Sequence, residues 1–98
     1  MFALTLTAMF NGPLATPVRW RSANGVQVAL GRGIYDEATE LVEADGDITA
    51  PTLLIPTSLW PALSKGDTVE IGSRTFRVRV VRLEDDGAVR RLILASVS

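Results

Sequence analysis

Short runs of alternating apolar and polar residues, separated by turn-forming dipeptides, extend along almost the whole chain of 98 residues. In the run from Phe2 to Met9, for example, threonines alternate with larger apolar side chains. A period of two residues places the apolar side chains on one side of a β-strand, whereas an amphipathic helix needs a period near 3.6. No segment is long enough for the helix of a parallel βαβ unit. The pattern therefore limits the chain to an all-β fold, with strands predicted over residues 2–9, 17–21, 26–35, 52–55, 67–71, 76–81 and 89–95.

Two dipeptides predict tight hairpins between these strands. Asn24-Gly25 separates residues 17–21 from residues 26–32, and Asp86-Gly87 precedes the last strand. Both dipeptides accept the positive φ angles that two-residue hairpin turns require. About seven mostly antiparallel strands with such turns are typical of a small β-barrel or sandwich.

Three residues predict local irregularities in the strands. Gly31 and Gly33 lie within one apolar run, and a glycine inside a strand is typical of a bend or bulge. Val81 interrupts the alternation of the strand before it, which indicates a second bulge.

One short helix is predicted over residues 57–65. Thr57 or Ser58 provides an N-cap, Pro61 is compatible with the first turn, and Gly66 ends the segment. Trp60 would then be part of the core, and we expect the same of Trp20 in its alternating strand.

The formal net charge of −1 hides a strong segregation of charge along the chain. Residues 36–50 are polar and acidic and contain neither lysine nor arginine, so we predict a long acidic surface loop in a single domain over residues 1–98. Two solvated surfaces, or an adaptor with an acidic end and a basic side, both fit this pattern. The acidic residues are Asp36, Glu37, Glu40, Glu43, Asp45 and Asp47, and the basic ones near the C-terminus are Arg74, Arg77, Arg79, Arg82, Arg90 and Arg91.

The residues that most enzymes use are scarce. The chain contains no histidine and no cysteine, so the commonest general base, the commonest neutral metal ligand and all thiolate chemistry are missing. Lys65 is the only lysine, and its neighbours Gly66-Asp67 predict a turn rather than a catalytic site. We therefore predict no enzymatic activity, no metal site and no cofactor. No run approaches the roughly 20 apolar residues of a membrane helix.

Four arginines support an alternative function. Arg77 and Arg79 lie on one predicted strand, and Arg90 and Arg91 lie on its hairpin partner. Together they would form a basic stripe for a nucleic-acid-binding module. The competing explanation is an exposed sheet surface that charge protects from aggregation, and no aromatic residues lie between the arginines for base stacking. An accessory β-domain for another ligand is the third alternative.

The order and spacing of several segments carry a family resemblance. They are Gly33-Ile34-Tyr35-Asp36-Glu37, the acidic segment, Pro51 to Thr57, Leu63 to Gly72, Phe76-Arg77-Val78, Asp85-Asp86-Gly87 and Leu92-Ile93-Leu94. From Gly31 onward, about two thirds of the chain resembles the lambda-type phage head–tail joining family, also called tail-attachment or head-completion proteins.

The resemblance implies a structural protein of the virion neck. Such a protein is a monomer in solution, is assembled in the bacterial cytoplasm, and forms a six-membered ring between head proteins of the portal or connector and the tail. Contact with the packaged DNA would be incidental. Because head-to-tail contacts use two different surfaces, we expect acidic residues of one subunit to meet arginines of the next. The expected interface residues are Asp36, Glu37, Glu40, Glu43, Asp45, Asp47, Arg77, Arg79, Arg90 and Arg91.

Overall fold

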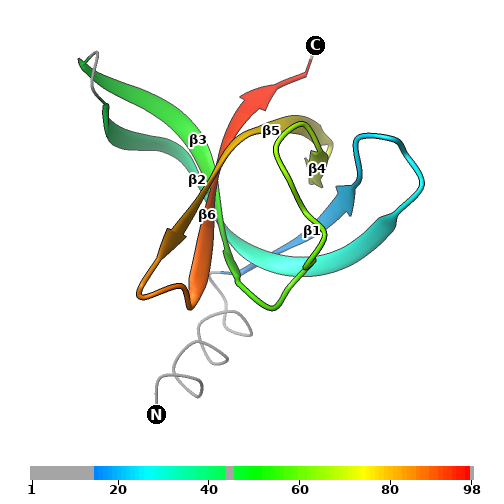
Figure 1. Ribbon diagram of the computed structural model, residues 1–98. Coiled ribbons are helices and arrows are strands. Elements are labelled where there is room, and N and C mark those ends of the chain that lie inside the picture. Colours follow the sequence, from blue (N-terminus) through cyan, green and yellow to red (C-terminus); the bar gives the residue numbers. More distant parts are fainter. Residues whose placement is uncertain (1–14, 44–45, 98) are drawn as a thin grey trace.

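A closed antiparallel barrel forms the body of the molecule in the computed structural model, which describes residues 15–43 and 46–97 (Figure 1). Around the barrel the strands follow the order β1-β2-β3-β6-β5-β4, and each pairs with its neighbours in antiparallel fashion. The all-β prediction is confirmed, although the described residues contain six strands rather than about seven. The strand predicted over residues 2–9 lies outside the described residues. The strands are β1 (Thr16–Arg21), β2 (Val28–Glu43), β3 (Gly46–Pro56), β4 (Thr68–Ile71), β5 (Arg74–Glu84) and β6 (Val89–Ser96).

Inward-pointing side chains of the strands fill the barrel. Val69 and Phe76 are fully buried, and their strands place them directly opposite each other. Trp20 and Trp60 stack with their ring centroids 6.1 Å apart, and both are 4 % exposed. The prediction that both tryptophans belong to the core is therefore confirmed. The main cluster comprises Val18, Trp20, Leu53, Ile55, Trp60, Leu63, Val69, Ile71, Phe76, Val78, Leu92 and Leu94.

Both predicted hairpins are present. Arg21 of β1 is the last residue paired before the Asn24-Gly25 turn, and its partner is Val28. The connection spans residues 22–27, longer than a two-residue turn, and within it Gly25 has the positive φ of 76° that glycine adopts without strain. The Asp86-Gly87 turn joins β5 to β6. The bulge in β5 falls between Val78 and Val80, slightly before the predicted position.

The predicted helix over residues 57–65 is wrong. The segment consists of turns, and the part of the chain that the structure describes contains no helix, so none there is long and apolar enough to cross a membrane. Trp60 has a φ of 51°, which interrupts any right-handed helix. It also precedes Pro61, and a proline disfavours the helical conformation of the residue before it. Stacking of the Trp60 indole on Trp20 outweighs the local capping signals.

The predicted loop over residues 36–50 is also wrong. Beyond the barrel, β2 and β3 continue as a two-stranded hairpin, which we call the arm (residues 36–43 and 46–50; Figure 1, upper left). A register shift between Asp36 and Thr39 marks its base, where the Thr39 and Thr52 hydroxyls lie 2.8 Å apart. A ribbon with solvent near both of its faces needs no apolar alternation, so its sequence did not indicate strands.

The ladder between β1 and β2 is unbroken across Gly31 and Gly33, so there is no bulge at these glycines. They instead permit close packing. A Cβ atom at Gly33 would lie 2.9 Å from the carbonyl oxygen of Leu54, and one at Gly31 would lie 2.7 Å from a methyl group of Leu59. The glycines therefore allow β2 to pass close to neighbouring parts of the barrel.

Candidate assembly surfaces

The acidic residues predicted to form an interface belong to the arm and its base. Asp36, Glu37 and Glu40 are exposed on β2. The carboxyl group of Asp36 accepts a hydrogen bond of 3.1 Å from the backbone N–H of Ala38, which supports the irregular register there. Glu37 lies 3.5 Å from Arg74 of the barrel.

Two of the predicted acidic residues lie nearer the tip. Glu43 pairs with Gly46, and Asp47 pairs with Val42, in the ladder of the arm. Asp45 lies outside the described residues. Among the side chains of the arm that the structure describes, Asp36, Glu37 and Glu40 carry negative charge.

A small apolar cluster fixes the arm to the barrel. Leu41 of β2 and Ala50 of β3 are buried together with Ile93 of β6. Ile93 lies on the outward side of its strand, because its neighbours Leu92 and Leu94 point into the core. The arm therefore has a defined direction relative to the barrel, set by apolar burial outside the main core.

The four arginines predicted to form one stripe have different environments. Arg77 and Arg79 of β5 are exposed, whereas Arg90 of β6 is only 7 % exposed. Arg90 and Arg91 are adjacent in one strand, so their side chains point to opposite sides of the sheet. Arg91 bonds to Glu84 at 2.8 Å. The continuous stripe expected from the sequence therefore does not form.

Arg90 stabilises the segment that replaces the predicted helix. Its guanidinium donates hydrogen bonds to the carbonyl oxygens of Leu59 and, at 2.9 Å, of Trp60. Burial lowers the pKa of this guanidinium from its usual value, yet arginine remains a cation in proteins. Arg90 thus binds the backbone carbonyl groups of Leu59 and Trp60 and is withdrawn from the surface.

We expect Arg90→Ala to lower the free energy of unfolding by about 2 kcal/mol, because the carbonyl groups of Leu59 and Trp60 lose a charged donor. Arg77→Ala removes an exposed side chain and should change stability by less than about 0.5 kcal/mol. Urea denaturation of both variants measures the difference, and equal losses would contradict this assignment of Arg90.

Sequence reasoning missed three further arginines. In the register, Arg21 of β1 lies opposite Thr68 of β4, which in turn lies opposite Arg77 of β5. Arg19 of β1 and Arg32 of β2 are also exposed, and Arg19 forms an ion pair of 3.5 Å with Glu70.

We call Arg19, Arg21, Arg32 and Arg77 the basic face. The alternation around Trp20 indicated that Arg19 and Arg21 point outward, but the pairing of β1 with β4 joins residues far apart in sequence and left no local signal.

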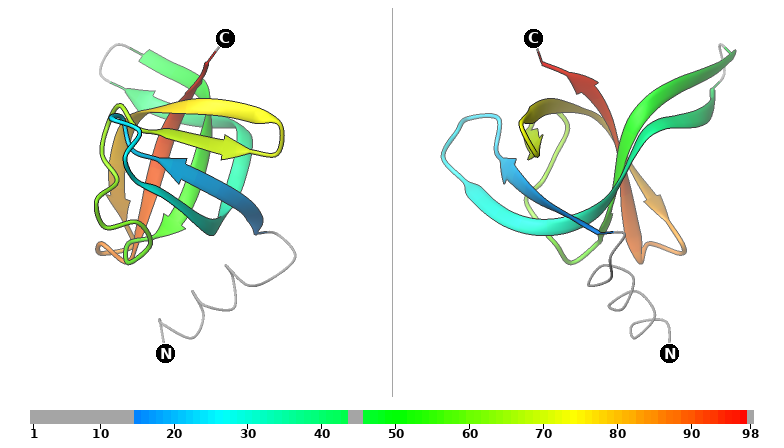
Figure 2. Two further views of the ribbon diagram at one scale, coloured as in Figure 1. Left: turned by 90° about the vertical axis from the view of Figure 1, so that its right-hand side faces the viewer. Right: turned by 180° about the vertical axis from the view of Figure 1, so that it is seen from behind.

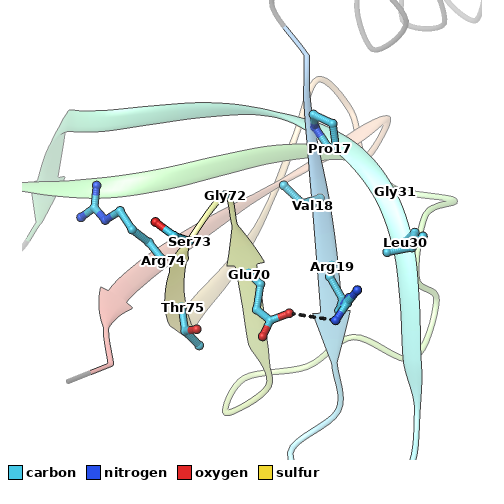
Figure 3. Close-up of a pocket in the computed structure, with 10 residues that line it drawn as sticks. All are labelled: Pro17, Val18, Arg19, Leu30, Gly31, Glu70, Gly72, Ser73, Arg74 and Thr75. Atoms are coloured by element: carbon cyan, nitrogen blue, oxygen red, sulfur yellow. Dashed lines mark ion pairs between the residues drawn. The ribbon is translucent and has the colours of Figure 1, made fainter.

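Exposed aliphatic side chains border the basic face. Val28 is 50 % exposed opposite Arg21, and Leu30 is 72 % exposed opposite Arg19. An open groove of ≈ 460 Å³ begins beside Leu30 and crosses β1 and β4 to Thr75. Figure 3 shows Arg19 and Glu70 pointing toward each other in this groove. A charged groove with an apolar border is suited to contact with another macromolecule.

No group of three or more acidic, histidine or cysteine side chains among the described residues is arranged to hold a metal ion. The candidate functional features of the described residues are thus two charged surfaces, the arm and the basic face.

Comparison with known proteins identifies the family. The model of the phage head–tail attachment protein family matches residues 1–94, so the match includes the N-terminal third in addition to the segments that carried the resemblance. No individual curated protein matches the chain. The family description implies a structural phage protein at the virion neck, where the head meets the tail. Since the match covers nearly the whole sequence, the chain belongs to the phage head–tail attachment protein family.

Proposed function

We propose that this protein is a non-catalytic subunit of a ring, with six members, that joins the DNA-filled head to the tail. The placement of an acidic arm and a basic face on different parts of one barrel carries this proposal. A subunit with two different, complementary surfaces can repeat head to tail until a ring closes. Head proteins of the portal or connector would contact one side of the ring, and tail proteins would contact the other. The monomer would be made in the bacterial cytoplasm and would assemble there on the filled head.

The direct test is joining in vitro. Heads that lack this chain are mixed with tails, with and without the purified protein, and infectious particles are counted. The proposal expects particles only when the chain is added. If a matched wild-type lysate completes these heads and tails but the purified chain does not, the joining function is refuted. Native mass spectrometry of completed necks then counts the subunits, and a number other than six contradicts the proposed stoichiometry.

Binding to nucleic acid is the second candidate, because the basic face presents four exposed arginines. Arginine binds phosphate groups through bidentate hydrogen bonds. If all four contacted phosphates of double-stranded DNA, the logarithm of affinity would fall with the logarithm of salt concentration with a slope of about −3.6. Fluorescence anisotropy with a labelled duplex measures this slope, and undetectable binding at low salt rejects this candidate.

A further inference from the structure

We infer that the arm of one subunit binds the basic face of the next subunit. This inference rests on the proposed ring and specifies the surfaces that hold it together. It replaces the predicted contact with Arg90 and Arg91 by one that centres on Arg21 and Arg77, which share a cross-strand row of the barrel.

Charge complementarity supports a second copy as the partner. Asp36, Glu37 and Glu40 give the described arm a negative surface. The one acidic residue in the groove of the basic face, Glu70, already lies 3.5 Å from Arg19. The remaining arginines leave the face positive, and a guanidinium group matches the planar geometry of a carboxylate. One chain therefore carries both halves of a complementary pair.

The composition of the face favours a protein partner over DNA. Val28 and Leu30 are exposed beside the arginines, within the same cross-strand rows as Arg21 and Arg19. Arginine beside apolar area is typical of protein interfaces, where burial of the apolar groups adds to the polar contacts. A phosphate backbone would satisfy the arginines but would not bury these two aliphatic side chains.

The position of the two surfaces favours a head-to-tail contact between copies. In Figure 1 the arm rises at the upper left, whereas β1 and β4 form the right-hand side of the barrel. Figure 2 confirms that the arm lies on the other side of the barrel from β1 and β4. At its base the arm reaches one end of the groove, where Glu37 pairs with Arg74. The apolar cluster around Ile93 holds the rest of the arm away from Arg21 and Arg77 of its own subunit. Contact between these surfaces therefore links different copies in one direction, as a ring requires.

A disulfide trap tests the contact directly. The natural chain has no cysteine, so one substitution per chain gives an unambiguous cross-link. We would mix the full-length variants Glu40→Cys on the arm and Thr68→Cys between Arg21 and Arg77, oxidise the mixture, and quantify heterodimers on a non-reducing gel. Ser58→Cys, an exposed position outside the basic face, replaces Thr68→Cys in the matched control. We expect at least about tenfold more heterodimer with Thr68→Cys, since a specific contact raises the effective concentration of the thiols. Equal yields at high protein concentration would overturn the inference.

A charge exchange between subunits provides the second test. Asp36→Arg with Glu37→Arg, in the chain that carries Glu40→Cys, makes the described arm positive, and Arg21→Glu with Arg77→Glu, in the chain that carries Thr68→Cys, makes the face negative. Each variant alone should be cross-linked roughly tenfold less than the unaltered pair, because like charges then meet. Mixing the two variants restores opposite charges and should restore the yield. Lys65→Glu, an exposed reversal in a turn outside both surfaces, should change nothing. If both variants are folded but their mixture does not regain the cross-linking yield of the unaltered pair, the inference is overturned.

These measurements use the purified chain, so they are independent of head–tail joining. Joining without the Thr68→Cys cross-link would leave the proposed function intact and refute this contact. Cross-linking without joining would support the contact and refute the proposed function. If Arg21→Glu with Arg77→Glu abolishes DNA binding but leaves the cross-link unchanged, the basic face binds nucleic acid and the inferred contact is wrong.

Discussion

Replacing Asp67 with alanine is expected to lower the free energy of unfolding by about 3 kcal/mol. Asp67 is 3 % exposed, and its carboxyl group accepts three hydrogen bonds of 2.9 Å. The donors are the indole N–H of Trp20 and the backbone N–H groups of Ala23 and Ser64. The substitution leaves these donors without this acceptor, and the buried indole N–H of Trp20 has the least access to water. It would therefore loosen both the Asn24-Gly25 hairpin and the segment that follows Trp60.

Urea denaturation followed by tryptophan fluorescence measures the effect, with an unchanged m-value as the sign of an intact native fold. A double-mutant cycle with Trp20→Phe isolates one of the three bonds, and we expect a coupling above about 0.5 kcal/mol between these contacting residues. Lys65→Ala, an exposed change in the same turn, should stay within about 0.5 kcal/mol of the wild type. A loss below about 1 kcal/mol for Asp67→Ala would show that the carboxyl group does not hold these segments together.

Gly33→Ala is expected to lower the free energy of unfolding by about 2–3 kcal/mol. A Cβ atom at this position would lie 2.8 Å from a methyl group of Leu53 and 2.9 Å from the carbonyl oxygen of Leu54. Leu54 belongs to β3, which pairs with β6 at this point, so its backbone cannot move without disturbing the barrel. The strain is therefore not relieved by a change of side-chain rotamer.

Gly31→Ala is the matched comparison, because the atoms that its Cβ would meet are all at the ends of the Leu59 and Trp60 side chains. Leu59 is only partly buried and can rotate, so we expect a loss of about 1 kcal/mol. Each variant adds one methyl group. Thermal unfolding of the two variants shows which of them loses more stability. A larger loss for Gly31→Ala would contradict the close backbone approach at Gly33.

Local signals determined most of the barrel. The alternation around Trp20, Val69 and Phe76 identified the inward side of three strands, because a strand's side-chain period of two is independent of its partners. The turn conformations at Asn24-Gly25 and Asp86-Gly87 are properties of the dipeptides themselves. For the same reason the all-β class and the hairpins were predictable. The order of the segments along the chain was enough to indicate the family that the family model matches over residues 1–94.

The helix and the loop were mispredicted because tertiary contacts decided their conformations. Trp60 takes a left-handed conformation in which its ring lies on Trp20, a residue forty positions earlier in the sequence. The arm gains its order from the backbone ladder between β2 and β3 and from burial of Leu41 against Ile93. Propensity and periodicity depend on short stretches of sequence, so neither of these contacts can be detected from them.

The candidate surfaces divide in the same way. The sequence by itself determined that charge is segregated, that Arg19 and Arg21 alternate with a core tryptophan, and that catalytic histidine and cysteine are missing. Only the tertiary structure decided that Arg90 is buried against backbone carbonyl groups, and that Arg21 and Arg77 share one exposed face. The physical reason is that strand alternation depends on the residue itself and its immediate neighbours. The pairing of β1 with β4, in contrast, depends on closing the barrel, which is a property of the whole chain.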